Sequence, residues 1–301
     1  IEKINLGQLN QLLPSLKLEG QLSCRATVEG ETDSLSSIIR LTAKDLSVKD
    51  IRLGNLLSET RFRPGRLSGF FDLSNGIAER ANINFLVGVY FDPKDKGFYL
   101  PLKDNRSIRA SIDKLEIKKP IEQLLNIKAS GTVDVSAGLE GSGYDPRISA
   151  KLEAKNLGWM NIDLGQAYAS FTYESKIANI LFKLNSFPIK DLQLSAEIPL
   201  KIDNTVTWLK YKSHHLDMSL SDVDLESVTK LSHDAAPNII PTIPVSGTLN
   251  AIAKLSGNLD SLESDLYLNI SELSVKDKEL GNGSLRAGIK DNIFHMHAQI
   301  M

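Results

Sequence analysis

Apolar and polar residues alternate with a period of two along most of this 301-residue chain. The alternation is clearest around Gly20, Gly131 and Gly247. The apolar positions that flank these glycines are Leu16, Leu18, Leu22, Cys24, Ala26 and Val28, then Ile127, Ala129, Val133, Val135, Ala137 and Leu139, and finally Ile243, Val245, Leu249, Ala251, Ala253 and Leu255. Such alternation predicts strands with one apolar face, and the central glycine predicts a bend or a close approach of two backbones.

The three glycine-centred segments have equivalent surroundings. Each is followed ten residues later by a second glycine and 34 residues later by a Leu-Gly pair, and the first glycines lie 111 and then 116 residues apart. Shared offsets with little shared sequence indicate a repeated architecture. We therefore predict one continuous repeat-built β segment over 1–301, with units of approximately 4–114, 115–222 and 223–301, the last one truncated.

The return strand of each unit carries a further shared irregularity. Its apolar residues alternate until Ala43, Ala154 and Ile270, and the next apolar residue then comes three positions later instead of two. A step of three within an alternating strand predicts a β-bulge or a short corner. Its occurrence at the same offset in all three units makes chance a poor explanation.

Helical periodicity is brief and precedes each glycine-centred segment. It covers Leu6–Leu13, Pro120–Leu125 and Leu225–Leu231, and a proline suits the first turn of a helix. At about 10–12 residues for a strand and its turn, the chain has room for on the order of 25 strands. Because open sheets of that size curl or split, we predict a mostly β fold, namely an elongated curled sheet (β-taco or solenoid-like) with a long hydrophobic groove and short interrupting helices.

Composition narrows the classes of function. Lys+Arg is 35 and Asp+Glu is 37, for a net charge of -2, so no basic excess favours nucleic acid as a partner. The single cysteine, Cys24, excludes an internal disulfide framework. No stretch approaches the ~18 consecutive apolar residues of a membrane span. The chain opens with Ile1 and has no signal-like segment, so we expect a piece of a longer protein.

No residue pattern predicts catalysis or a cofactor. His295 and His297 lie on one face of a predicted strand, but two histidines do not complete a metal site. The adjacent Ser232, His233 and Asp234 do not have the geometry of a catalytic triad. The segments 92–97 and 101–106 are expected to be polar turns. We therefore expect no enzyme activity, no metal and no cofactor.

Several segments resemble a known family. They are the leader Leu6–Pro14, the Leu-Glu-Gly at 18–20, the third-unit segment Val245–Leu249, its continuation Leu255–Leu259, and then Leu273–Val275 with Leu280-Gly281. They look like the TamB branch of the AsmA-like envelope proteins. The resemblance covers most of the chain and rests on β periodicity and glycine placement.

The resemblance implies a function and a location. Members of the family are similar in having an inner-membrane anchor, a periplasmic β-taco body and a region that faces an outer-membrane barrel protein of the BamA/TamA type. This chain is then expected to be a periplasmic segment of a bridge-like protein that carries phospholipid between the two membranes. Its expected partners are phospholipid acyl chains, the anchor outside this fragment and the barrel protein.

The predicted lining of the groove is the repeated apolar set. It consists of Leu22, Ile39, Leu41, Val133, Val135, Leu152, Leu249, Ala251, Leu266 and Leu268. Burial of each CH₂ group of a lipid contributes about 0.8 kcal/mol. The same alternation also fits a closed core between two sheets. Two further functions stay open, namely an assembly factor that offers strand edges to outer-membrane β-barrel proteins and a purely structural spacer.

Overall fold

The structure is a computed structural model. It describes residues 4–300 apart from 12–14, 16, 32–33, 93–96, 126–127, 160–161, 187, 203–205, 210–211, 236–243, 259, 277 and 292. The predicted turn at 92–97 therefore lies mostly outside the described residues.

The described residues form twenty strands and three short helices, which follow one another in a repeating order. The first part comprises β1 (Ile4–Asn5), the 3₁₀ helix η1 (Leu6–Gln11), β2 (Leu18–Glu29), β3 (Ser36–Val48), β4 (Ile51–Arg63), β5 (Arg66–Ser74), β6 (Arg80–Val87), β7 (Tyr90–Asp92), β8 (Gly97–Tyr99) and β9 (Arg106–Glu116). The second comprises α1 (Lys118–Leu125), β10 (Ala129–Gly141), β11 (Pro146–Trp159), β12 (Ile162–Glu174), β13 (Ile177–Asn185), β14 (Ile189–Ile202), β15 (Val206–Trp208) and β16 (His214–Asp224). The third comprises α2 (Leu225–Ala235), β17 (Val245–Asn258), β18 (Ser261–Val275), β19 (Lys278–Lys290) and β20 (Ile293–Ile300).

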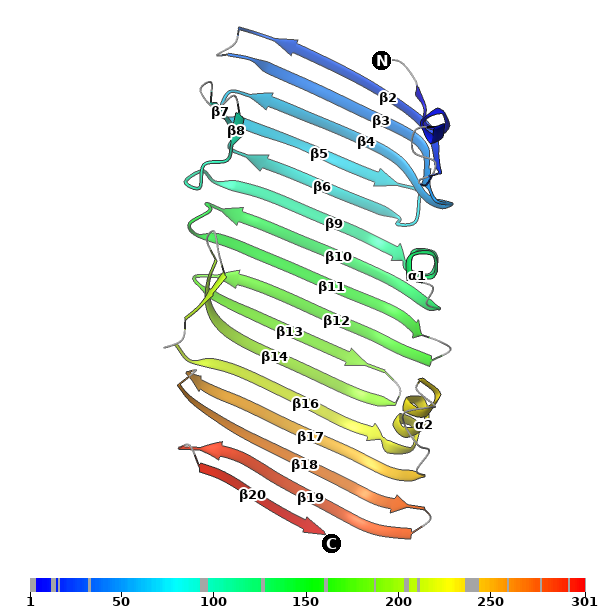
Figure 1. Ribbon diagram of the computed structural model, residues 1–301, viewed down its shortest axis with the longest axis vertical. Coiled ribbons are helices and arrows are strands. Elements are labelled where there is room, and N and C mark those ends of the chain that lie inside the picture. The colour runs from blue at the N-terminus through cyan, green and yellow to red at the C-terminus, as the bar shows by residue number, and fades with distance from the viewer. Residues whose placement is uncertain are drawn as a thin grey trace.

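Eighteen of the strands form one antiparallel sheet, and β7 pairs with β8 separately. Apart from the short β1 and β15, sixteen strands lie side by side in chain order from β2 to β20 (Figure 1). The mostly β prediction and the short interrupting helices are confirmed. The strands are fewer than the predicted number because many run for 12–15 residues, as β18 does with 15, and short turns join them.

The predicted irregularities are β-bulges. The register between β3 and β4 shifts between Ala43 and Leu46, and equivalent shifts occur in β11 and β18. Opposite each of these positions lies a glycine with positive φ, at 117° for Gly20, 129° for Gly131 and 131° for Gly247. A Cβ atom at Gly131 would stand 3.0 Å from the carbonyl oxygens of Lys155 and Asn156. The glycines are therefore required by both the backbone conformation and the close approach of the paired strand.

The residue that bulges out opposite the glycine has a left-handed backbone, as in Asp45 and Glu272. The amide N–H of Asp45 donates to Oδ1 of Asn55 at 3.1 Å, and that of Glu272 donates to Oδ1 of Asn282 at 2.9 Å. These side chains replace the ladder hydrogen bond that the bulge interrupts.

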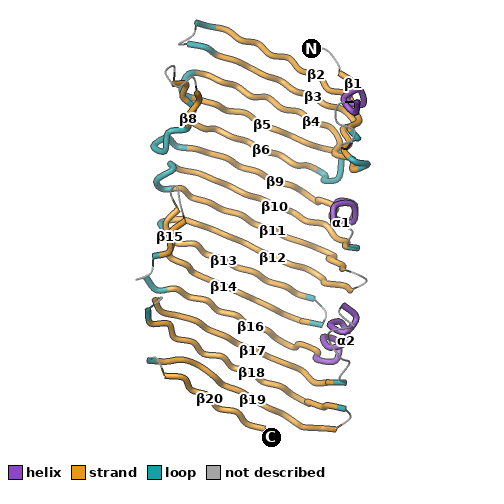
Figure 2. The backbone as a smooth tube through the Cα atoms, in the orientation of Figure 1, coloured by secondary structure: helices purple, strands orange, loops and turns teal. Residues whose placement is uncertain are grey.

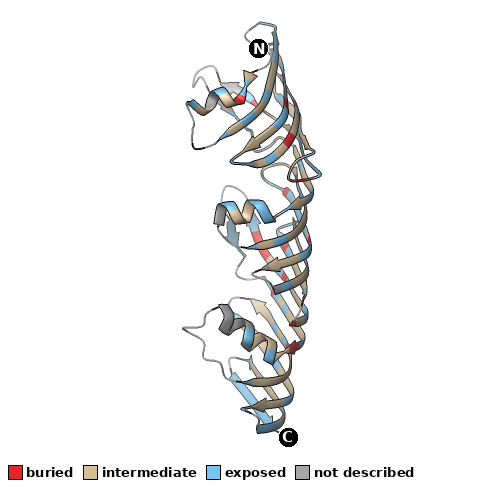
Figure 3. Ribbon diagram, turned by 90° about the vertical axis from the view of Figure 1, so that its right-hand side faces the viewer, coloured by how far each residue is buried: buried red, intermediate tan, exposed pale blue. Residues whose placement is uncertain are grey.

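The helices all lie at one end of the strands, and the extra strands β7, β8 and β15 lie at the other end (Figure 2). η1 packs on β2, α1 on β10, and α2 on β16 and β17. In the edge-on view the strands curve toward the side on which α1 and α2 lie (Figure 3).

The sheet is a single layer over most of its area. In the part of the chain that the structure describes, the extensive contacts of each strand are with its neighbours in the sheet, and no second sheet packs against its face. The closed core between two sheets is therefore excluded for these residues. Among the residues with a described environment, a compact core forms where the end of β14 meets β12 and β13, around Tyr173, Ala178 and Leu200. None of the described helices has the length and apolar character needed to cross a membrane.

Candidate apolar binding face

One row of side chains runs across the whole sheet without a polar residue. Each member is the direct partner of the next in the antiparallel register, with one residue from each of the sixteen strands. The row, called here the central row, consists of Leu22, Ala43, Leu56, Leu73, Ala81, Ile112, Val135, Leu152, Ala169, Phe182, Leu194, Met218, Ala253, Leu266, Ala287 and Met296. Because paired residues in a sheet project to the same side, the central row is a continuous apolar stripe.

Two parallel rows widen the stripe. On the side of the helices, an entirely apolar row runs from Leu115 in β9 through Val133, Ala154 and their partners to Ala298 in β20. On the other side, a row from Cys24 to Phe294 contains only two polar residues, Ser58 and Ser264. Successive residues on one face are about 6.8 Å apart along a strand, so three rows make a stripe on the order of 14 Å wide between its outer Cα atoms.

All ten residues of the predicted lining lie on this one face, which is called here the apolar face. Leu22, Val135, Leu152 and Leu266 belong to the central row. The others lie one or two rows away on the same side: Ile39, Leu41, Val133, Leu249, Ala251 and Leu268.

The apolar face is only partly buried. In the central row Ala43 alone is buried, whereas Leu152 is 37% and Met296 66% exposed. The remaining members are half-buried by their neighbours in the sheet. Large contiguous apolar patches on protein surfaces are typical of interaction sites, so the apolar face is the candidate binding surface.

The opposite face is polar. The row next to the central one, read from β2 to β20, is Ser23, Thr42, Leu57, Asp72, Asn82, Ser111, Ser136, Lys151, Ser170, Leu181, Ser195, Asp217, Lys254, Asp265, Gly288 and His295. Thirteen of its sixteen members are polar, so the two faces of the sheet differ sharply in character.

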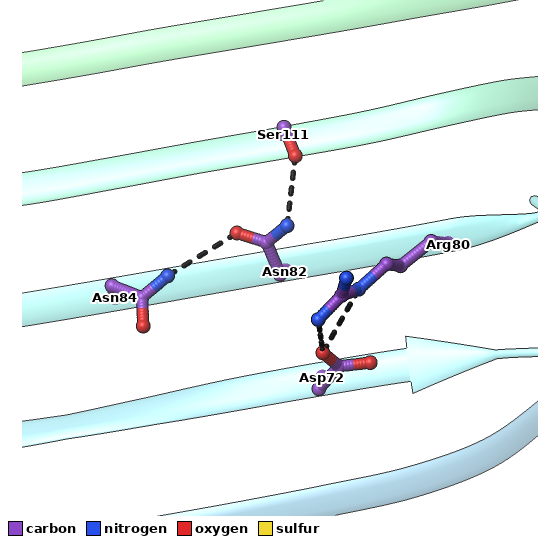
Figure 4. A network of polar contacts seen from close by, with 5 residues as sticks. All are labelled: Asp72, Arg80, Asn82, Asn84 and Ser111. Atoms are coloured by element: carbon purple, nitrogen blue, oxygen red, sulfur yellow. Dashed lines mark hydrogen bonds and ion pairs between the residues drawn. The ribbon is translucent and has the colours of Figure 1, made fainter.

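Cross-strand hydrogen bonds and ion pairs join this polar face. Arg80 of β6 pairs with Asp72 of β5, and Nδ2 of Asn82 donates to Oγ of Ser111 at 2.9 Å (Figure 4). Figure 4 views the sheet from the side opposite to that of Figure 1, because β5 points to the right in both figures but the order of β5, β6 and β9 from top to bottom is reversed. The labelled side chains therefore project away from the face on which the helices lie. The apolar face is therefore the one toward which the sheet curves.

Ion pairs also perturb carboxyl groups on the polar face. The hydrogen bond that Arg40 donates to Glu59 lowers the pKa of this carboxyl, assisted by Arg61 and opposed by partial burial. In the third unit the hydrogen bond from Arg286 lowers the pKa of Asp265. The causes are structural ion pairs, and the charged forms hold adjacent strands together.

A buried histidine lies at the edge of the apolar face, under the short strand β15. His214 is 6% exposed, and its ring centroid lies 5.9 Å from that of Trp208. Neither ring nitrogen has a hydrogen-bond partner among the described residues. Sequence reasoning missed this site because the contact depends on how β14 and β15 fold back, which no local periodicity indicates.

The structure also places the other candidate residues. His295 and His297 lie on β20 on the polar face, and no group of three metal-ligating side chains occurs in the described residues. The side chains of Ser232, His233 and Asp234 lie outside the described residues.

Comparison with models of protein families, with curated proteins and with solved structures finds no match to this chain. The class that the fold defines is a long, open, single-layer antiparallel β-sheet with one apolar and one polar face.

Proposed function

We propose that this chain holds the acyl chains of phospholipids on its apolar face and is a segment of a bridge-like lipid carrier of the bacterial envelope. The observation that carries the proposal is the central row, which crosses all sixteen strands without a polar residue. An apolar surface binds hydrocarbon without directional contacts, so a bound chain keeps much the same buried area as it moves from strand to strand. A uniform stripe therefore gives low barriers to movement along the sheet.

The size of the stripe supports an acyl-chain ligand. Sixteen strands at ~4.8 Å spacing extend over about 70 Å, which is longer than a single acyl chain. At about 0.8 kcal/mol for each buried CH₂ group, contact with part of two chains offsets the cost of ordering them. The proposed setting, the periplasm with partners in both membranes, rests on the family resemblance alone.

The test compares the two faces of the sheet. Leu41, Leu152 and Leu268, all on the apolar face, are changed together to Asp, and the protein is purified without detergent and analysed by native mass spectrometry. We expect the unaltered protein to carry phospholipid and the triple variant to have lost it. The matched control changes Leu57, Leu181 and Ile252 to Asp; these residues lie on the polar face.

The control is expected to keep its lipid. Circular dichroism checks that each variant retains its β content. Retention of phospholipid by a folded apolar-face variant would exclude this site, and equal loss from both variants would show that the effect is not specific to the face.

A further inference from the structure

Arginine is distributed unevenly along the chain. Nine of the eleven arginines lie before residue 110, whereas the later units use lysine almost exclusively. Five of these arginines lie on the polar face of β2–β5, toward the end of the strands opposite the helices: Arg25, Arg40, Arg61, Arg63 and Arg66. They are called here the arginine patch.

Four arginines of the patch form two pairs of direct cross-strand partners. Arg25 is the cross-strand partner of Arg40, and Arg63 is the partner of Arg66 across the Pro64-Gly65 turn. Like charges directly opposite each other destabilise a sheet. The fold alone therefore gives no reason for these pairs.

The carboxylates of the patch do not neutralise it. Glu59 accepts hydrogen bonds from Nε of Arg40 at 2.5 Å and Nε of Arg61 at 2.6 Å. Arg25, Arg63 and Arg66 form no ion pair with any residue in the described part of the chain. Even with Glu29 counted beside Glu59, five positive charges face two negative ones, an excess of three on one surface.

The surroundings of the patch are those of a protein interface. A cavity of about 430 Å³ adjoins it, with Arg61, Phe70, Asn84 and Arg109 among its lining residues. Ile38 and Leu57, which lie between the arginines, are 37% and 49% exposed. Arginine and aromatic residues are enriched and lysine is depleted at protein–protein interfaces, and the guanidinium group binds a carboxylate through two parallel hydrogen bonds.

We propose that the arginine patch is a docking surface for an acidic segment of a partner protein, whose carboxylates bind the uncompensated guanidinium groups. Ser68, Asn84 and Ser107 also line the cavity, and their hydroxyl and amide groups can form further hydrogen bonds with a protein segment. An anionic bilayer attracts Lys and Arg alike through their charge, whereas the patch is built of arginine with no lysine between residues 57 and 70, as suits paired hydrogen bonds to carboxylates. This surface is on the face opposite the proposed lipid path, so the two proposals can fail separately.

The test uses a fluorescein-labelled decapeptide of alternating Glu and Ser, which has no apolar residue to bind the apolar face. Fluorescence anisotropy at low salt is expected to show binding that is lost at 1 M salt, where the screening length is about 3 Å. Changing Arg25, Arg63 and Arg66 together to Gln leaves the Arg40–Glu59 ion pair intact and is expected to weaken binding at least about tenfold. The matched control changes Lys151, Lys183 and Lys254 to Gln on the same face and is expected to leave binding unchanged.

Thermal unfolding separates docking from a structural role. Because like-charge pairs oppose folding, the arginine variant is expected to melt no lower than the unaltered protein. Equal weakening by the lysine control, or a lower melting temperature of the arginine variant, would overturn the proposal. So would arginine-dependent binding to vesicles with 30% phosphatidylglycerol in the absence of peptide binding.

Discussion

At the scale of single residues, the sheet depends on a few positions where the alternation is interrupted. Gly20, Gly131 and Gly247 each have positive φ opposite a residue with a left-handed backbone. The sequence was sufficient to locate these bulges, because a step of three among alternating apolar residues is a local signal. It did not reveal that Asn55 and Asn282 accept the freed N–H groups, since those contacts join different strands.

Substitution of Gly131 by Ala tests the role of the bulge glycines. The new Cβ would meet two carbonyl oxygens at 3.0 Å in a backbone region that alanine disfavours, so we expect a loss of roughly 1–3 kcal/mol of stability. Gly138→Ala in the same strand is the control. Its φ is not in the left-handed region, and its Cβ would meet only the movable Oγ of Ser149. Denaturant unfolding followed by circular dichroism measures both, and equal stability of the two variants would contradict this role.

At the scale of elements, cross-strand pairs decide which side of each strand faces water. Alternation along β2 and β3 was enough to predict that Leu22, Ile39 and Leu41 share one face, and their register agrees. Alternation does not determine whether a second sheet covers that face, because the pattern is the same in an open sheet and in a sandwich. The contact between β15 and His214 was equally inaccessible, since it depends on a chain reversal outside the regular meander.

The ion pairs between strands predict a pH dependence. The pKa of Glu59 is lowered in the folded protein, first by the hydrogen bond from Arg40. The stability from this carboxylate is therefore fully present above its unfolded pKa of about 4.3 and is lost as the pH falls through the lower folded pKa. We expect Glu59→Gln to lower the melting temperature at pH 7 and to have progressively less effect as the medium becomes acidic.

The control for this prediction is Glu263→Gln. Glu263 lies on the polar face and forms no ion pair with the residues that the structure describes. Its substitution is expected to change the melting temperature little at pH 7 and at pH 3. A deficit of Glu59→Gln that stays constant down to pH 3 would exclude the ion pair as its cause.

At the scale of the whole molecule, the repeat of a helix followed by strands builds one continuous surface instead of separate cores. Bulges near the helix end accompany the curve of the sheet toward its apolar side (Figure 3). Exposure of that side is costly in water, since apolar surface contributes about 25 cal/mol per Å² when it is covered. We propose that a mobile hydrocarbon ligand covers the apolar face.

The most direct test of that account is to map where a lipid lies. The detergent-free protein is loaded with a phospholipid that carries a photoreactive diazirine near the end of one acyl chain, irradiated, digested and analysed by mass spectrometry. We predict adducts on central-row residues from all three units, such as Leu73, Phe182 and Leu266, and a low yield on polar-face residues such as Leu57 and Ile252. Adducts confined to the polar face, or spread equally over both faces, would contradict the account.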